Sequence, residues 1–273
     1  MRRRFAKLAV NGALLLLALL TALPLLWMVS ASFMPTGEAM SLPARLLPSR
    51  PTIEHYGTLF SRLALGRTFG NTLFLATSVT AISLLCNSMA GYAFAKLRFG
   101  GRGRLFALLL ATLVVPPQVT VLPLFLEIRS LHLVNSFGGV IVAGIATVFG
   151  IFLIRQFALG IPDELLDAAR IDGASELRIY WTIVLPALRP ILITLGVFTF
   201  LTAWNDFMWP LIVLTDESKY TLPVALANLS GEHVQDTELM MAGAVVTVLP
   251  GLLLFLALQR YYVQGILMGS VKE

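Results

Sequence analysis

The sequence predicts an all-α membrane protein with six transmembrane helices. Its 273 residues are 57% hydrophobic and only 13% charged, with a mean hydropathy of +0.83, whereas soluble domains carry roughly 25% charged residues. The apolar residues form continuous runs of helical length, and they do not alternate with polar residues over ~10-residue segments as in the strands of a membrane β-barrel. This composition argues against a soluble single-domain enzyme, a disordered chain and a nucleic-acid-binding protein.

The predicted helices lie between the charged residues, because a helix needs about 20 apolar residues to cross a bilayer core. A sixth stretch, Pro190–Thr215, is as long and apolar as the other five but is interrupted by Asp206. We predict helix 1 at about 8–33, an external segment over 34–68 and core helices 2–6 over about 69–262, in a single transmembrane domain of residues 1–273. The five uncharged stretches are Leu8–Gly37, Thr68–Ala95, Leu105–Leu126, Ser130–Ile154 and Leu239–Gln259.

The first helix follows the basic run Arg2-Arg3-Arg4, as the apolar part of a cleaved signal peptide would. That part of a signal peptide is usually about 7–15 residues long. The run here is longer, which favours a helix that stays in the protein.

The distribution of basic residues predicts the orientation, since Lys and Arg are retained on the cytoplasmic side of membrane proteins. With the N-terminus inside, 14 of the 20 Lys and Arg residues fall in cytoplasmic segments, and both termini are cytoplasmic. The segment 34–68 departs from this rule, because it holds four arginines against two glutamates. The last external loop follows the rule and is mainly acidic.

Asp206 is the one acidic residue deep in a predicted span, and an ionisable group there usually faces a cavity, a partner or the bundle interior. It could contact substrate, couple a proton or hydrogen-bond the end of a neighbouring helix. Its neighbour Trp204 could stack on a sugar ring or lie at the membrane interface. The Pro116-Pro117 pair frees backbone carbonyls, which membrane helices tolerate beside a cavity. The predicted translocation path therefore contains Gln118, Trp204, Asn205 and Asp206.

A loop of residues 156–189 lies on the predicted cytoplasmic side, between helices 4 and 5. Pro162 ahead of Asp163 and Glu164 is a helix-start signal, because acids in the first turn are favoured by the helix dipole. Gly173 predicts the end of this short helix, since glycine accepts the left-handed conformation that a helix stop needs. A second helix is expected from position 174 or 175 to about 186.

The first of these two helices carries the small residues Ala168 and Ala169, which would let another surface approach closely. We therefore predict a docking element for a cytoplasmic partner. The alternative is an amphipathic helix that rests on the membrane surface. The five acidic residues of the loop argue against contact with anionic lipid.

The loop sequence Asp167-Ala168-Ala169-Arg170-Ile171-Asp172-Gly173-Ala174, followed by Ile183-Val184-Leu185-Pro186, resembles the EAA loop of bacterial ABC importer permeases. Asp167 stands where that family usually has Glu, so this carboxylate reaches one methylene less far. The resemblance extends from about Phe69 to Glu273. Three further stretches resemble the carbohydrate-uptake branch, in particular its maltose-type second permease subunit: Gly91-Tyr92-Ala93-Phe94-Ala95, Trp204-Asn205-Asp206-Phe207, and Gln259–Gly265 with Gly269–Lys272.

The resemblance implies the permease subunit of an ATP-binding-cassette importer, which moves a sugar or sugar-like solute across the bacterial cytoplasmic membrane by alternating access. Its implied partners are a second homologous permease subunit, a dimer of cytoplasmic ATPase subunits and an external solute-binding protein, together with membrane lipid but no nucleic acid. The residues implied to couple to the ATPase are Asp163, Glu164, Asp167, Ala168, Ala169, Asp172 and Gly173.

The chain lacks the Gly-x-x-x-x-Gly-Lys-Ser/Thr stretch that cradles ATP phosphates. We therefore expect ATP and magnesium on the partner ATPase, no cofactor or metal on this chain, and no enzymatic activity of its own. The single cysteine, Cys86, and three scattered histidines provide no metal-ligand spacing.

Two functions of other classes remain as alternatives. An ion-coupled secondary transporter would use Asp206 as its proton or sodium site, but such proteins usually carry more ionisable groups in the membrane and broken-helix repeats. An intramembrane enzyme would need a nucleophile with its base, or a metal cluster, within the spans. The sequence does not identify the transported sugar.

Overall fold

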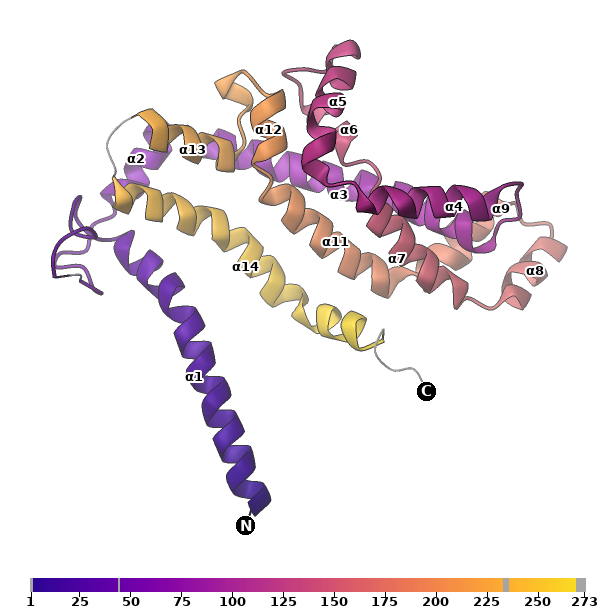
Figure 1. Ribbon diagram of the computed structural model, residues 1–273, viewed down its shortest axis with the longest axis horizontal. Helices are drawn as coiled ribbons and strands as arrows, with labels where there is room; N and C mark the ends of the chain where they lie inside the picture. Colours follow the sequence, from indigo (N-terminus) through magenta and orange to yellow (C-terminus); the bar gives the residue numbers. More distant parts are fainter. Residues whose placement is uncertain (1, 44, 233–235, 269–273) are drawn as a thin grey trace. The chain divides into compact units, whose positions relative to one another are not determined.

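The computed structural model describes residues 2–43, 45–232 and 236–268, and the described residues form helices and connecting loops without β-strands (Figure 1). The chain forms two compact units. The first comprises residues 1–68 and 225–250, and the second comprises residues 69–224 and 251–273.

The first unit begins with α1 (Arg2–Ala31) and contains α2 (Glu54–Arg62), most of α13 (Leu222–Glu232) and the first part of α14 (Thr237–Met268). Leucines of α1 are largely exposed, for example Leu16 at 67%. A helix that exposes so much apolar side chain is suited to a lipid environment.

The segment after α1 folds back and is held in the first unit by a small core and by buried polar contacts. Met34 and Ala39 are buried and pack with Trp27 of α1 and Met241 of α14. The Glu238 carboxylate, which is 1% exposed, accepts a hydrogen bond of 2.7 Å from the Ala39 N–H.

The second unit contains the remaining helices. Two apolar cores lie at different levels of α3: one surrounds Tyr92 and Ala95, and the other surrounds Leu75. The helices are α3 (Leu65–Lys96), α4 (Arg102–Ala111), α5 (Pro117–Ser130), α6 (Phe137–Ala143), α7 (Val148–Leu159), α8 (Asp163–Ile171), α9 (Glu176–Ile179), a π-helical turn (Tyr180–Val184), α10 (Leu185–Ala187), α11 (Arg189–Trp204) and α12 (Met208–Val213), with short 3-10 turns at Thr112–Val114 and Glu217–Lys219.

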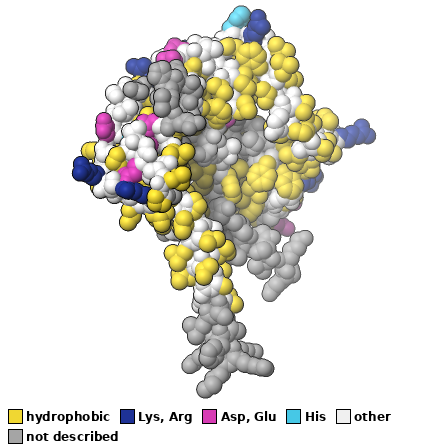
Figure 2. Space-filling model, turned by 60° about the vertical axis from the view of Figure 1, so that its left-hand side comes forward, with side chains coloured by type: hydrophobic (Ala, Val, Ile, Leu, Met, Phe, Trp, Pro, Cys, Tyr) yellow, Lys and Arg dark blue, Asp and Glu magenta, His cyan; other side chains and the backbone are white. Residues whose placement is uncertain are grey.

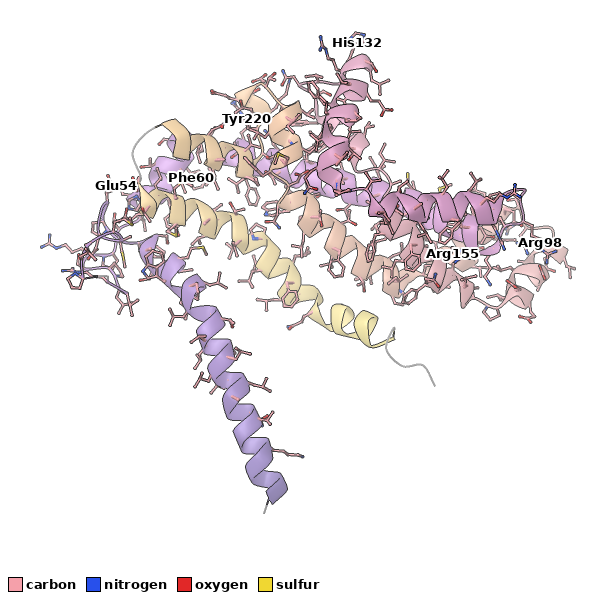
Figure 3. All side chains as sticks on the ribbon, in the orientation of Figure 1. Glu54, Phe60, Arg98, His132, Arg155 and Tyr220 are labelled. Atoms are coloured by element: carbon pink, nitrogen blue, oxygen red, sulfur yellow. The ribbon has the colours of Figure 1, made fainter. Side chains whose placement is uncertain are left out.

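Titratable side chains are found at both ends of the second unit. Figure 3 shows His132 at the tip of α5 and Arg98 near α8, far from it. The Arg155 guanidinium lies 4.2 Å from the centroid of the Phe106 ring and also donates to the Phe94 carbonyl at 3.2 Å. On the face shown in Figure 2, apolar side chains predominate between the few charged ones.

Among the described residues, three helices are long and apolar enough to cross a membrane: Val10–Ala31, Leu65–Lys96 and Thr237–Ala257. Three further helix pairs reach that length together but are bent. Candidate spans therefore number three, or up to six if each bent pair is one span. The bends are 109° between Arg102–Val114 and Pro117–Ser130, 48° between Phe137–Ala143 and Val148–Leu159, and 79° between Glu176–Ala187 and Arg189–Trp204.

The stretches predicted over Leu105–Leu126, Ser130–Ile154 and Pro190–Thr215 are thus broken and not continuous helices. Proline explains the first break, because Pro116 and Pro117 lack the N–H groups that would continue α4. At the second break a new helix begins, because Thr147 is the N-cap of α7. Its hydroxyl accepts a hydrogen bond of 3.1 Å from the Gly150 N–H. The third stretch is interrupted after Trp204, where α11 ends and three residues precede α12.

Candidate functional site

Helix α8 has the boundaries that its sequence predicts. Pro162 is extended and precedes the first helical residue, Asp163. Gly173 has a φ of +79°, and its N–H donates to the Arg170 carbonyl at 3.0 Å while the Ala174 N–H donates to the Ala169 carbonyl at 2.9 Å. This pair of bonds is a Schellman motif. Because glycine alone adopts such a φ without strain, Gly173 fixes both the end of α8 and the direction of the chain into α9.

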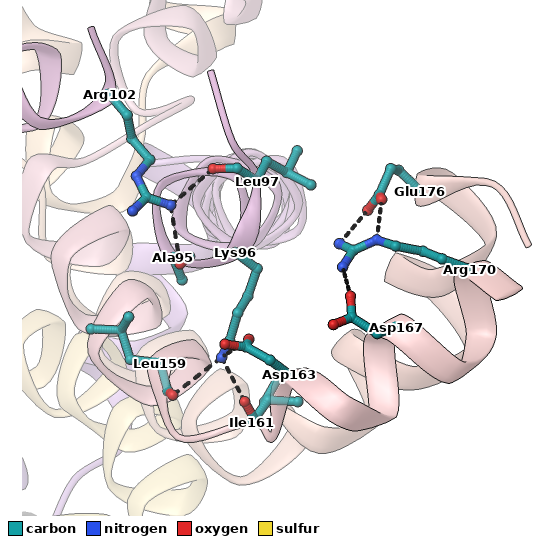
Figure 4. A network of polar contacts seen from close by, with 10 residues as sticks. All are labelled: Ala95, Lys96, Leu97, Arg102, Leu159, Ile161, Asp163, Asp167, Arg170 and Glu176. Atoms are coloured by element: carbon teal, nitrogen blue, oxygen red, sulfur yellow. Dashed lines mark hydrogen bonds and ion pairs between the residues drawn. The ribbon is translucent and has the colours of Figure 1, made fainter. Parts of the chain in front are cut away.

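A polar network holds α8 from both ends (Figure 4). At its N-terminus the Lys96 ammonium lies 2.7 Å from the Asp163 carboxylate and lowers the pKa of that carboxyl below its usual range. At its C-terminus Arg170 pairs with Glu176 and with Asp167, each at 2.7 Å. Hydrogen bonds from Arg170 to these two carboxylates raise the pKa of its guanidinium, which therefore stays charged.

The pairing with Arg170 shows what the aspartate at position 167 does within this chain. Asp167 and Arg170 are three residues apart and therefore lie on the same side of α8. The Asp167 carboxylate nevertheless remains 64% exposed, so it is accessible to a second partner.

The seven predicted coupling residues lie together on the surface of α8 and the turn that follows it. Ala169 is half-buried against the apolar core around Tyr92, and the other six residues are exposed. Leu166 anchors α8 through its fully buried side chain, while Leu165 and Ile171 are exposed at 49% and 87%. The helix therefore combines a fixed inner face with an outer face of acidic, small and apolar side chains.

A second candidate site is a cavity of about 520 Å³ inside the second unit. Its polar groups come from four threonines on α5, on α11 and at the N-cap of α7, from Thr221 and from Asp206. Among the described residues that line it, Asp206 is the one ionisable side chain. The other lining residues are Leu75, Val79, Pro117, Val121, Leu124, Val140, Ala143, Gly144, Phe149, Leu195, Phe198, Ala203, Trp209 and Pro210, and the four threonines are Thr120, Thr147, Thr199 and Thr202.

The cavity contains one of the four predicted path residues. Asp206 lines it and accepts a hydrogen bond of 3.3 Å from the Trp209 N–H. Gln118 and Asn205 are exposed and are not among the described residues that line the cavity. Trp204 is 0% exposed and packs between Phe69 and Phe200, with ring centroids 5.4 and 5.8 Å away. Its surroundings are those of a core residue.

The model of one protein family matches residues 87–268, and its description is "Binding-protein-dependent transport system inner membrane component". The chain belongs to this family. The matched region contains the C-terminal part of α3, all of α8 and the cavity-lining residues of α5, α6, α7, α11 and α12. The family match thus covers α8 and all of the cavity lining except Leu75 and Val79.

Several curated relatives of this permease are sugar-transport permeases. It is 39% identical over 259 residues to the arabinooligosaccharides transport system permease protein AraQ of Halalkalibacterium halodurans, which covers 94% of this chain and 93% of that protein. It is 32% identical over 272 residues to the lactose transport system permease protein LacG of Rhizobium radiobacter, covering 100% and 98%. The predicted membership of the carbohydrate-type ABC importer permeases is confirmed, and the permease is a transport subunit and not an enzyme.

A solved structure shares the fold. A chain of a bacterial ABC transporter involved in the import of the acidic polysaccharide alginate matches with a TM-score of 0.85 and 24% identity, over 96% of this permease and 98% of that chain. The all-helical fold of this permease is therefore shared with a chain of an ABC transporter.

Sequence reasoning did not identify the residues that hold α8 in place. In the sequence, Lys96 is one of the 14 basic residues on the predicted cytoplasmic side, and Glu176 is one of the five acids of the loop. Tyr92 stands in a stretch that resembles the family, but its hydroxyl donates to the Glu176 carboxylate at 2.7 Å, a contact across 84 residues that no local pattern indicates.

Proposed function

We propose that this permease is a six-span subunit of an ABC importer in the bacterial cytoplasmic membrane, with both termini cytoplasmic. It moves a sugar or sugar-like solute by alternating access. The energy comes from the hydrolysis of ATP, which is bound with magnesium by a separate dimer of ATPase subunits. A second, homologous permease completes the pathway, and an external solute-binding protein delivers the cargo. The family and the sugar-transport relatives support this proposal.

The observation that carries the proposal is the construction of α8. A surface helix of nine residues has little intrinsic stability, since isolated helices shorter than ~12–15 residues are marginal in water. Here it is fixed by a buried leucine, a Schellman motif and ion pairs at both ends. A rigid helix with an exposed outer face can transmit a push from a cytoplasmic partner, whereas a loosely attached helix would absorb it.

The side chains that line the cavity favour an uncharged cargo. Hydroxyl groups and one carboxylate line it, and the described lining residues include no Lys, Arg or His. An anionic sugar would meet the Asp206 carboxylate without a compensating cation, which is costly where water is scarce. We therefore expect uncharged oligosaccharides, such as those named for the relatives, to be better cargo than uronates or sugar phosphates.

The experiment is purification of the tagged permease from its native membranes in mild detergent. We expect a P-loop ATPase and a second permease to co-purify and the complex to hydrolyse ATP. Gly173→Pro should reach the membrane but lose the ATPase, because proline cannot adopt a φ of +79°. Gly173→Asn is the matched control, since asparagine tolerates this conformation.

The outcome that would contradict the proposal is solute uptake by the purified chain alone, without ATP. It would favour the ion-coupled alternative, for which the location of Asp206 in the cavity is the relevant observation.

A further inference from the structure

Helix α3 carries three polar side chains on one face: Ser88, Tyr92 and Lys96. They are four residues apart, so they lie one above another along the helix, about 6 Å apart in rise. All three bond to the segment that contains α8 and α9.

Lys96 bonds to the beginning of that segment. Its side chain is 5% exposed, and its ammonium donates to the Leu159 carbonyl at 3.3 Å, the Ile161 carbonyl at 2.6 Å and the Asp163 carboxylate at 2.7 Å (Figure 4). One cation therefore connects the end of α7, the turn and the first residue of α8 to α3.

The other two side chains bond further along. The Tyr92 hydroxyl donates to Glu176, the first residue of α9, at 2.7 Å, and Arg170 of α8 binds the same carboxylate. Ser88 shares a hydrogen bond of 2.7 Å with the Tyr180 hydroxyl in the π-helical turn. The three contacts thus meet the segment before α8, after α8 and at the exit towards α11.

The geometry restricts relative motion. One bond would let α8 pivot on α3, but three bonds spread over about 12 Å of a helix axis fix position and rotation together. Closer to its N-terminus, α3 contributes Leu75 and Val79 to the wall of the cavity. A displacement of α8 is therefore carried along a rigid helix to the cavity.

We propose that Ser88, Tyr92 and Lys96 are positioning residues that make α3 move with α8, so that the ATPase acts on the cavity through α3. This inference rests on the proposed function, because it assumes an ATPase that pushes on α8. The residues touch neither cargo nor nucleotide. Their role is to transmit motion.

Cys86 provides a natural reporter, because it is the one cysteine of the chain and lies on α3 two residues before Ser88. The experiment measures the rate at which a maleimide labels Cys86 in the purified complex, with the other subunits made cysteine-free. The rate is compared without nucleotide and with ATP plus vanadate, and ATP hydrolysis is measured on the same samples.

In the wild type we expect ATP to change the labelling rate. The double substitution Ser88→Ala with Tyr92→Phe, and separately Lys96→Met, should lose that change while the complex still assembles and hydrolyses ATP. Lys96→Arg should restore it, since it keeps the cation. Thr80→Val is the matched control, because the Thr80 hydroxyl donates within α3, to the Ala76 carbonyl at 2.6 Å.

The inference is overturned if the variants hydrolyse ATP and still show the wild-type change at Cys86. It is also overturned if ATP hydrolysis and the Cys86 response fall in parallel, both in Tyr92→Phe alone and in the double variant. Failure of these variants to assemble counts as such a parallel loss. The residues would then merely stabilise the fold. A wild-type complex that hydrolyses ATP without any response at Cys86 would show that α3 does not move. Absence of a bound ATPase would instead contradict the proposed function.

Discussion

Gly91 of α3 lies close against α7, and Gly91→Ala should separate the two helices. A Cβ at position 91 would lie 2.5 Å from Ile154 Cγ2, 2.7 Å from Ile154 Cβ and 3.0 Å from the Arg155 backbone nitrogen. Ile154 is fully buried, and two of these atoms belong to or adjoin the backbone, so no side-chain rotation relieves the contact. The helices themselves have to move.

The expected loss of stability follows from two opposing effects. Overpacking a core typically costs about 1–3 kcal/mol, whereas alanine in place of glycine within a helix gains about 0.5–1 kcal/mol. The balance lies between about zero and a net destabilisation of about 2.5 kcal/mol. A protein of this size responds to a destabilisation with a decrease in melting temperature of roughly 2–4 °C per kcal/mol.

The assay is thermal unfolding of the purified permease in detergent, with Gly70→Ala as the matched control. Gly70 lies in the same helix, and a Cβ there would meet nothing within 4 Å. Gly70→Ala should therefore be neutral or slightly stabilising. If Gly91→Ala were as stable as Gly70→Ala, the close contact between α3 and α7 would be refuted.

Three further predictions concern side chains of the second unit. Trp204→Ala should destabilise the permease by about 3–5 kcal/mol in the same assay, whereas a Trp204 that served only the cargo could be removed without loss of stability. Asn87→Leu should cost about 0.5–1.5 kcal/mol, because it removes the side-chain amide oxygen of Asn87 that accepts a hydrogen bond of 2.9 Å from the Thr147 N–H; retention of the wild-type melting temperature would contradict this. Asp206→Asn should leave ATP-driven uptake of lactose or arabinotriose, whichever the wild type transports, largely intact, since an amide oxygen still accepts from Trp209. Complete loss of that uptake would favour ion coupling through Asp206.

The sequence predicts the coupling loop in detail because the signals there are local. Pro162 begins α8 and Gly173 ends it, and both act through their own backbone geometry. The family resemblance of residues 167–174 adds the function. Local chemistry of this kind does not depend on the rest of the fold.

The predicted spans are less accurate, because hydropathy measures the length of an apolar stretch and not the direction of its backbone. The stretch Leu105–Leu126 is uncharged throughout, yet its helices meet at 109°. The Pro116-Pro117 pair predicts an interruption of the helix at that point, but a proline does not specify the angle between the two helices that it separates.

The cavity and the network behind α8 could not be predicted from the sequence, since both depend on residues far apart in the chain. Trp204 illustrates the difficulty, because an aromatic side chain next to an intramembrane Asp206 fits a binding site and a core equally well. Its full burial between two phenylalanine rings favours the core. Tyr92 and Glu176 become connected only after the chain has folded.

The central claim is that α8 is the surface on which an ATPase acts, and cross-linking from a cysteine in place of Ala168 tests it most directly. The substitution Ala168→Cys is made with Cys86→Ser, so that the new thiol is the one reactive cysteine of the chain. The control carries Ser130→Cys at the end of α5 instead, a position predicted to be external. In native membranes treated with a short thiol cross-linker, we expect the ATPase to be joined to position 168 and not to position 130. An ATPase joined to neither position, or to position 130 alone, would contradict the account.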